Sequence, residues 1–169
     1  MIIAGLNYDL LKKQKIGMEY LKFSGNDSKT EDKSFQPIFP ACHKYLGYTD
    51  MFLPSNIKDI VFSYKNTFTK NLFWGLDYHI MSLDKSGDAP TYYGYGMPAY
   101  ARVVHSAANT EEDLGSEINF TARYVHSKNV TFSTGLARFK SGNYFTDTKQ
   151  NGSSFTANWS FLMTEVKFK

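Results

Sequence analysis

Two ionisable residues set two positions apart, Asp77 and His79, offer the clearest chemistry in this sequence. They share one face of any extended strand, because strand side chains alternate between two faces. A hydrolase would need a nucleophile such as serine oriented by the histidine. No serine–histidine set shares the apolar face of the strands, so we predict no enzymatic activity and no catalytic residue. The alternative, an outer-membrane enzyme, predicts hydrolase activity that is lost on changing His79.

Patterns typical of cofactor, metal and nucleic-acid sites are missing from the sequence. Cys42 is the single cysteine, which excludes an internal disulfide framework and a zinc knuckle. The glycines of 94–99 are spaced loosely as in a dinucleotide loop, but they follow no strand and open no helix. The formal net charge is only +3, with acidic and basic residues interleaved. We therefore expect no cofactor, no metal and no nucleic-acid partner.

The segments that carry the ionisable residues alternate apolar and polar side chains. Between 72 and 82, for example, apolar residues alternate with a series that includes Gly75, Asp77 and His79. No apolar run approaches the roughly 18 residues of a spanning helix. An apolar face opposite single charges and small polar residues is typical of transmembrane strands. The alternation marks the segments 2–9, 15–23, 57–65, 72–82, 116–126, 130–139 and 158–168.

We predict an all-β fold, an antiparallel up-and-down transmembrane β-barrel, present as a partial barrel of about seven strands with long extracellular loops. The alternative is a soluble lipocalin-like β-barrel that binds an apolar ligand, with the apolar faces turned inward. We prefer the membrane barrel because the polar faces mix single charges with glycine, serine, threonine and asparagine, as a water-filled lumen would.

Connections between the strands alternate in length. Those at 10–14, 66–71 and 127–129 are short, whereas those at 25–55, 84–113 and 140–154 are long. Outer-membrane barrels have short periplasmic turns and long extracellular loops. The alternation therefore predicts a periplasmic C-terminus and an extracellular Met1. Because complete single-chain barrels have an even strand count, we expect residues 1–169 to be the C-terminal portion of one barrel domain. Unpaired edges in lipid are costly, so we expect this portion alone to be unstable or to need a partner.

The segment 35–62 and three later motifs carry a family resemblance. The first motif comprises Phe35, Pro37, Phe39, Pro40, His43, Lys44, Tyr45, Gly47, Tyr48, Asp50 and Asn56. The later motifs comprise Asp77, Tyr78 and His79, then Leu114, Gly115 and Glu117, then Gly135, Phe139 and Gly142, before the closing strand. Together, over residues 35–168, they resemble the alginate export family of outer-membrane proteins.

The resemblance implies a porin-like channel or exporter in the outer membrane of a Gram-negative bacterium, passing a polysaccharide or small solute. Its partners would be outer-membrane lipid, the barrel-assembly machinery and the transported solute. The final strand, ending in Val166, Lys167 and Phe168, is the expected recognition signal for that machinery.

Strand parity predicts which residues line the lumen. The candidates are Asp59, Lys65, Asp77, His79, Glu117, Arg123, Glu165 and Lys167. With Asp9 and Glu19 added, this face counts more acids than bases, which does not support alginate specificity and favours a general porin-like member.

Two of the long loops carry further candidate residues. In the loop motif His43, Lys44, Gly47 and Asp50, the first two residues can bind an anion or pin the loop by a structural hydrogen bond, and we prefer the second interpretation. Loop 84–113, dense in tyrosine and glycine, can narrow the lumen, bind sugars by stacking or pack on itself.

Overall fold

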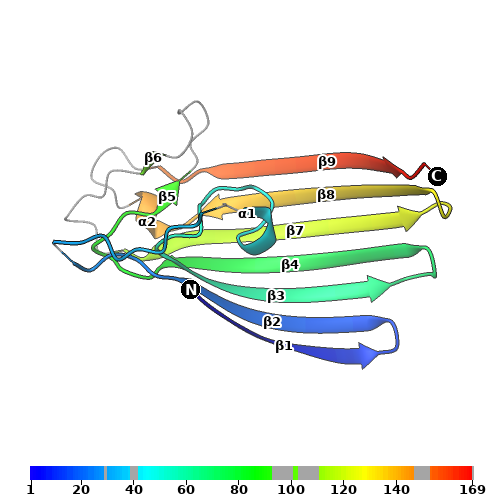
Figure 1. Cartoon of the computed structure of the whole chain (residues 1–169), viewed down its shortest axis with the longest axis horizontal. Coiled ribbons are helices and arrows are strands. Elements are labelled where there is room, and N and C mark those ends of the chain that lie inside the picture. The colour runs from blue at the N-terminus through cyan, green and yellow to red at the C-terminus, as the bar shows by residue number, and fades with distance from the viewer. Residues whose placement is uncertain (29, 39–41, 93–100, 103–110, 147–152, 169) are drawn as a thin grey trace.

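The structure is a computed structural model that describes residues 1–28, 30–38, 42–92, 101–102, 111–146 and 153–168. Seven strands form one antiparallel sheet in chain order (Figure 1). They are β1 (Ile2–Leu11), β2 (Gln14–Phe23), β3 (Ile57–Thr67), β4 (Leu72–Leu83), β7 (Asp113–Val125), β8 (Val130–Ser141) and β9 (Thr156–Val166). All seven predicted strands are confirmed. Each strand begins and ends within three residues of its predicted first and last positions.

Four short elements belong to the long connections. They are α1 (Cys42–Tyr45), the paired strands β5 (Thr91–Tyr92) and β6 (Ala101–Arg102), and α2 (Asn143–Thr146). In the described part of the chain, no helix is long and apolar enough to cross a membrane.

The ends of the sheet differ, as the loop lengths predict. The short turns after β1, β3 and β7 lie at one end, together with the C-terminus (Figure 1). The long connections lie at the other end, where β1 begins. We call these the turn end and the loop end.

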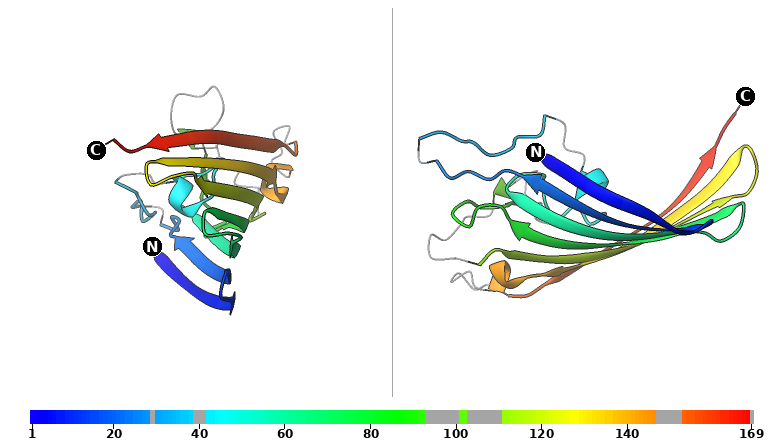
Figure 2. Two further views of the ribbon diagram at one scale, coloured as in Figure 1. Left: turned by 90° about the vertical axis from the view of Figure 1, so that its right-hand side faces the viewer. Right: turned by 90° about the horizontal axis from the view of Figure 1, so that it is seen from below.

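The sheet is curved and open. Figure 2 shows that its strands bend into a trough, with α1 on the concave side. Among the described residues, no ladder joins β1 to β9. The fold is therefore a partial barrel, as predicted.

The two faces reverse the usual distribution of a water-soluble protein. The convex face exposes large apolar side chains, with Leu6 81%, Leu136 56% and Leu162 82% exposed. The concave face carries charges along most of its length. A lipocalin-like protein would turn its apolar face inward, so the soluble alternative is wrong.

A small apolar core closes the loop end of the concave face. There Leu46 and Phe52, which follow α1, pack with residues from β2, β3, β4, β7 and β8 and from α2. The rings of Phe52 and Phe139 meet edge to face with centroids 5.6 Å apart. This core joins the long connection between β2 and β3 to the inside of the trough.

Candidate functional site

The predicted lumen residues all share the concave face. Strand pairing places His79 between Val61 and Glu117, and Asp77 between Ser63 and Asn119. The alternation along the strands also places on this face Asp59, Lys65, Arg123 and Glu165. Lys167 lies just beyond β9 and continues it. Their role as lumen-lining residues remains a prediction.

Charges on this face are separated along the strands. Lys15 on β2 and Lys65 on β3 lie opposite each other in the strand register near the turn end, and Arg123 lies near the same end. Glu19, Asp59, Asp77 and Glu117 lie closer to the loop end.

Several carboxylates on this face already have partners within the chain. The Asp59 carboxylate lies 2.7 Å from Nδ1 of His79, and both side chains are buried. Asp9 and Lys15 form an ion pair at 3.4 Å, and Glu165 and Lys167 form one at 3.2 Å. These pairs reduce the acidic charge that a solute would meet, and the pair with Asp9 also offsets the charge of Lys15.

Glu117 is the anchor for a second segment. Its buried carboxylate accepts the backbone N–H groups of Tyr48 at 2.7 Å and Thr49 at 3.1 Å. It also accepts the hydroxyl of Thr49. We call residues 42–56, which include α1, the inner segment.

The inner segment also contacts β9 through an aromatic stack. The rings of Tyr48 and Trp159 are nearly parallel, with centroids 5.3 Å apart. Burial raises the pKa of the Tyr48 hydroxyl, and the charge of Asp77 raises it further. Tyr48 therefore stays neutral and bridges the trough from the inner segment to its far edge.

The loop motif is explained by backbone shape. Gly47 has φ +86°, and a Cβ there would lie 2.3 Å from Oε1 of Glu117, so only glycine fits. Asp50 also has a positive φ, 51°. The side chain of Lys44 is exposed, with its ammonium 4.9 Å from the ring centroid of Tyr45. The side chain of His43 lies outside the described residues, so anion binding by His43 and Lys44 stays a prediction.

Asn56 ties the loop end together. Its side-chain amide donates to the carbonyls of Lys85 and Asp88 at 3.1 and 2.8 Å and accepts the N–H of Lys85 at 2.8 Å. Nearby, the Asp84 carboxylate binds the ammonium of Lys22 at 2.8 Å. The base of two long connections is thus cross-linked by polar contacts.

It is loop 25–55, through its inner segment, that occupies the concave face. Most of loop 84–113, including the glycines of 94–99, lies outside the described residues. The predicted narrowing of the lumen by that loop therefore stays a prediction.

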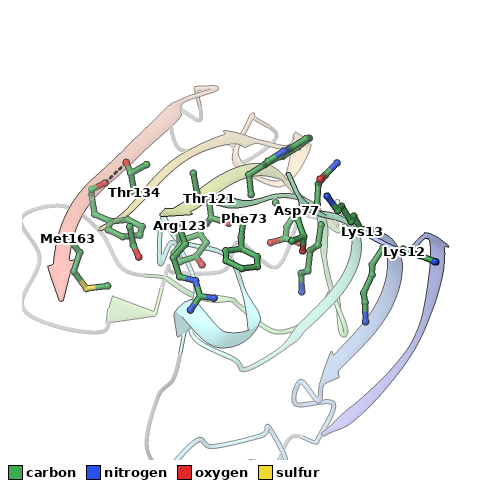
Figure 3. Close-up of a pocket in the computed structure, with 18 residues that line it drawn as sticks. Lys12, Lys13, Phe73, Asp77, Thr121, Arg123, Thr134 and Met163 are labelled. Atoms are coloured by element: carbon green, nitrogen blue, oxygen red, sulfur yellow. Dashed lines mark hydrogen bonds between the residues drawn. The ribbon is translucent and has the colours of Figure 1, made fainter. Parts of the chain in front are cut away.

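An open cavity of about 470 Å³ lies on the concave face toward the turn end. Figure 3 shows Phe73, Asp77 and Arg123 pointing from β4 and β7 into the same space. The Arg123 guanidinium lies over the Phe73 ring, 4.8 Å from its centroid. Five cations line the cavity beside the single carboxylate of Asp77: Lys12, Lys13, Lys15, Lys65 and Arg123.

The cavity lining adds cations that the predicted count of lumen charges left out. That prediction left out Lys15, which lies on the concave face, and the turn residues Lys12 and Lys13, which line the cavity. The signal was present in the sequence, because three lysines cluster at one short turn. The lining of this cavity, near the turn end, is basic. Within the described ranges, no group of three or more histidine, cysteine or acidic residues is arranged to hold a metal ion.

Comparison with known families agrees with this geometry. The family model described as alginate export matches residues 4–158, most of the chain. The chain belongs to the alginate export family. This is a family of outer-membrane transport proteins of Gram-negative bacteria. No curated protein matches the chain.

The match to the alginate export family begins within β1, whereas the resemblance read from the motifs began at residue 35. It therefore includes the first two strands. The family motifs meet in space at the loop end, where Glu117 holds the inner segment and Phe139 packs on Phe52. Gly115 has φ +125°, and a Cβ there would lie 2.2 Å from the carbonyl oxygen of Lys140.

Proposed function

We propose that this chain forms part of an outer-membrane channel in a Gram-negative bacterium that passes an anionic polysaccharide or a small anionic solute. The observation that carries the proposal is the basic cavity at the turn end of the concave face. Membership of the alginate export family supports transport across the outer membrane. The exposed apolar convex face supports direct contact with lipid.

The chemistry of the cavity suits an acidic sugar. Lysine and arginine attract carboxylates, and Arg123 presents a planar donor fork next to an aromatic face. Phe73 and Phe161 add ring surfaces on which a sugar can stack. Because the cavity is open and the cations come from different strands and turns, binding is distributed over several weak contacts. Conduction requires such weak, multiple sites.

We also propose that the barrel-assembly machinery recognises the final strand. β9 ends at Val166, and the Phe168 side chain beyond it is 91% exposed. Catalysis is not part of the proposal, because the family is one of transport proteins.

The test begins with the full-length gene product in its native membrane. A barrel extracted in detergent is expected to migrate differently on a gel before and after boiling. Recovery in the soluble fraction, with no mobility shift, would contradict the proposal.

Ion selectivity then tests the basic cavity. The triple variant Lys15→Gln, Lys65→Gln, Arg123→Gln is expected to shift the reversal potential in a salt gradient toward cation preference. The matched control, Lys70→Gln with Lys128→Gln and Lys140→Gln, removes the same charge from residues that do not line the cavity and is expected to shift it less. Equal shifts would show that net charge, not the cavity, sets selectivity.

A further inference from the structure

The apolar surface of the convex face has a sharp limit toward the loop end. Along each strand from β2 to β9, the apolar series on this face stops at one polar residue. These residues are Lys22, Lys58, Ser82, Ser116, Arg138 and Ser160. The limit runs diagonally across the strands. On β2 and β3 the two limit residues, Lys22 and Lys58, are paired directly, whereas on β8 the limit residue Arg138 is paired with Ile118, which still belongs to the apolar series of β7. Tilted strands in a membrane produce such a diagonal.

Two of the cations at this limit are neutralised by the chain itself. Lys22 pairs with Asp84 at 2.8 Å, and Lys58 lies 3.5 Å from Glu112. They serve the loop-end structure and leave little charge for a ligand.

Arg138 and its neighbour Lys140 differ from these two. Within the described part of the chain, neither has an ion-pair partner, and both are exposed. The residues paired with them on β7 and β9 are uncharged: Ile118, Asn158, Ser116 and Thr156. Two adjacent, uncompensated cations therefore face outward where the apolar surface ends.

A groove of about 470 Å³ runs from Arg138 into the apolar surface. Its apolar wall is formed by Leu76, Ile118, Phe120 and Leu136. The groove exists because Ser160 and Asn158 on β9 are small where they face Leu136 and Arg138. A second convex groove, lined by Leu6 and Phe62 among others, contains no charged residue. Only the first combines an apolar channel with a cation at its polar end.

We propose that this groove binds a phosphate-bearing lipid of the outer leaflet. Arg138 and Lys140 bind the phosphate, and one acyl chain lies along Leu136, Phe120 and Leu76. A guanidinium matches phosphate oxygens in a two-pronged hydrogen bond. Basic pockets beside apolar surface recognise anionic lipid head groups in this way. The inference rests on the proposed placement of the convex face in the outer membrane.

Lipid binding by the intact barrel tests this assignment. The folded protein is titrated with phosphatidylcholine vesicles doped with lipid A in its phosphorylated or its dephosphorylated form. Wild type is expected to bind phosphorylated lipid A more tightly. The variant Arg138→Gln/Lys140→Gln is expected to lose about tenfold in affinity, the loss of one or two charge-assisted hydrogen bonds.

Two further variants sharpen the test. Lys70→Gln/Lys128→Gln removes the same charge at the turn end and is expected to bind as wild type does. Ser160→Leu fills the groove without changing charge and is expected to weaken binding of either form of lipid A. Equal affinity of wild type for both forms, or unchanged binding by Arg138→Gln/Lys140→Gln, would overturn the assignment.

Barrel formation is measured separately from lipid binding. The gel mobility shift and the ion conductance of Arg138→Gln/Lys140→Gln are expected to match wild type. A protein that forms a conducting barrel but ignores the phosphate refutes the lipid site alone. One that never inserts refutes the proposed function, and the lipid site with it.

Discussion

Glu117 on β7 accepts the backbone N–H of Tyr48 at 2.7 Å, although 69 positions separate the two residues. The contact holds the inner segment against the concave face. Glu117→Ala leaves two partly buried N–H groups without this acceptor, at a cost of about 1 kcal/mol each. We expect faster proteolysis of the inner segment and a larger single-channel conductance. Ser116→Ala, on the opposite face, is the control. Unchanged proteolysis and conductance in Glu117→Ala would show that the segment is held by its apolar core alone.

Gly47 is expected to be intolerant of any side chain. Gly47→Ala places a Cβ against the Glu117 carboxylate and forces a left-handed backbone, which alone costs about 1–2 kcal/mol. The temperature at which the folded form converts to the unfolded form on a gel should fall. Gly87→Ala is the matched control, because no atom lies within 4 Å of its added Cβ. Similar behaviour of the two variants would contradict the close contact.

The pair of Asp59 and His79 is expected to show strong coupling. Both side chains are buried, with Asp59 0% exposed, so His79→Leu leaves a carboxylate without its partner. Breaking one side of a buried pair costs about 3–5 kcal/mol, whereas removing both sides is often neutral. In guanidinium unfolding of the micelle-bound barrel, Asp59→Leu/His79→Leu should therefore be more stable than His79→Leu. If the double variant shows the summed loss of the single variants, the two residues are not coupled.

Acid is expected to loosen the loop end. Burial acts to raise the pKa of Asp84, but hydrogen bonds from Lys22 and from the N–H of Gly25, with the charge of Lys22, lower it below its ordinary 3.8. Because the folded pKa is the lower one, this stabilisation is present above about pH 4 and is lost as the pH falls through the folded value. Digestion by an acid-active protease should therefore show a step below about pH 4 in the connections after β2 and β4.

Asp84→Asn should remove that acid step and leave the same connections sensitive at neutral pH. Asp9→Asn, near the turn end, should keep the step. A step that persists in Asp84→Asn would assign it to another carboxylate.

The strands were predictable because every one of them presents an apolar face opposite a polar face. This two-residue repeat continues along each strand, so the alternation alone predicts where the strand begins and ends. The largest miss, the start of β7, coincides with an irregularity in its pairing opposite Met81 and Ser82, where Gly115 takes a positive φ. Alternation fails at such a point because an irregular step changes which face a residue occupies.

The inner segment was not predictable as a part of the site. Its position depends on contacts such as Glu117 with Thr49, which join distant stretches and leave no local pattern. The motif residues pointed to the segment, and Asn56 does precede β3 as expected, but the partner of Gly47 emerges only in three dimensions. The prediction of lumen residues from strand alternation considered only residues within strands. It therefore missed Lys12 and Lys13, which lie in the turn.

In the proposed channel, the separation of charge along the concave face gives the pore a direction. Lys65 and Arg123 near the turn end, with Glu19 and Asp77 nearer the loop end, act as an electric dipole along the strands. An ion that enters from one end meets attraction first, and one that enters from the other end meets repulsion first. Such a pore carries more current at one sign of voltage than at the other, so it behaves as a rectifier.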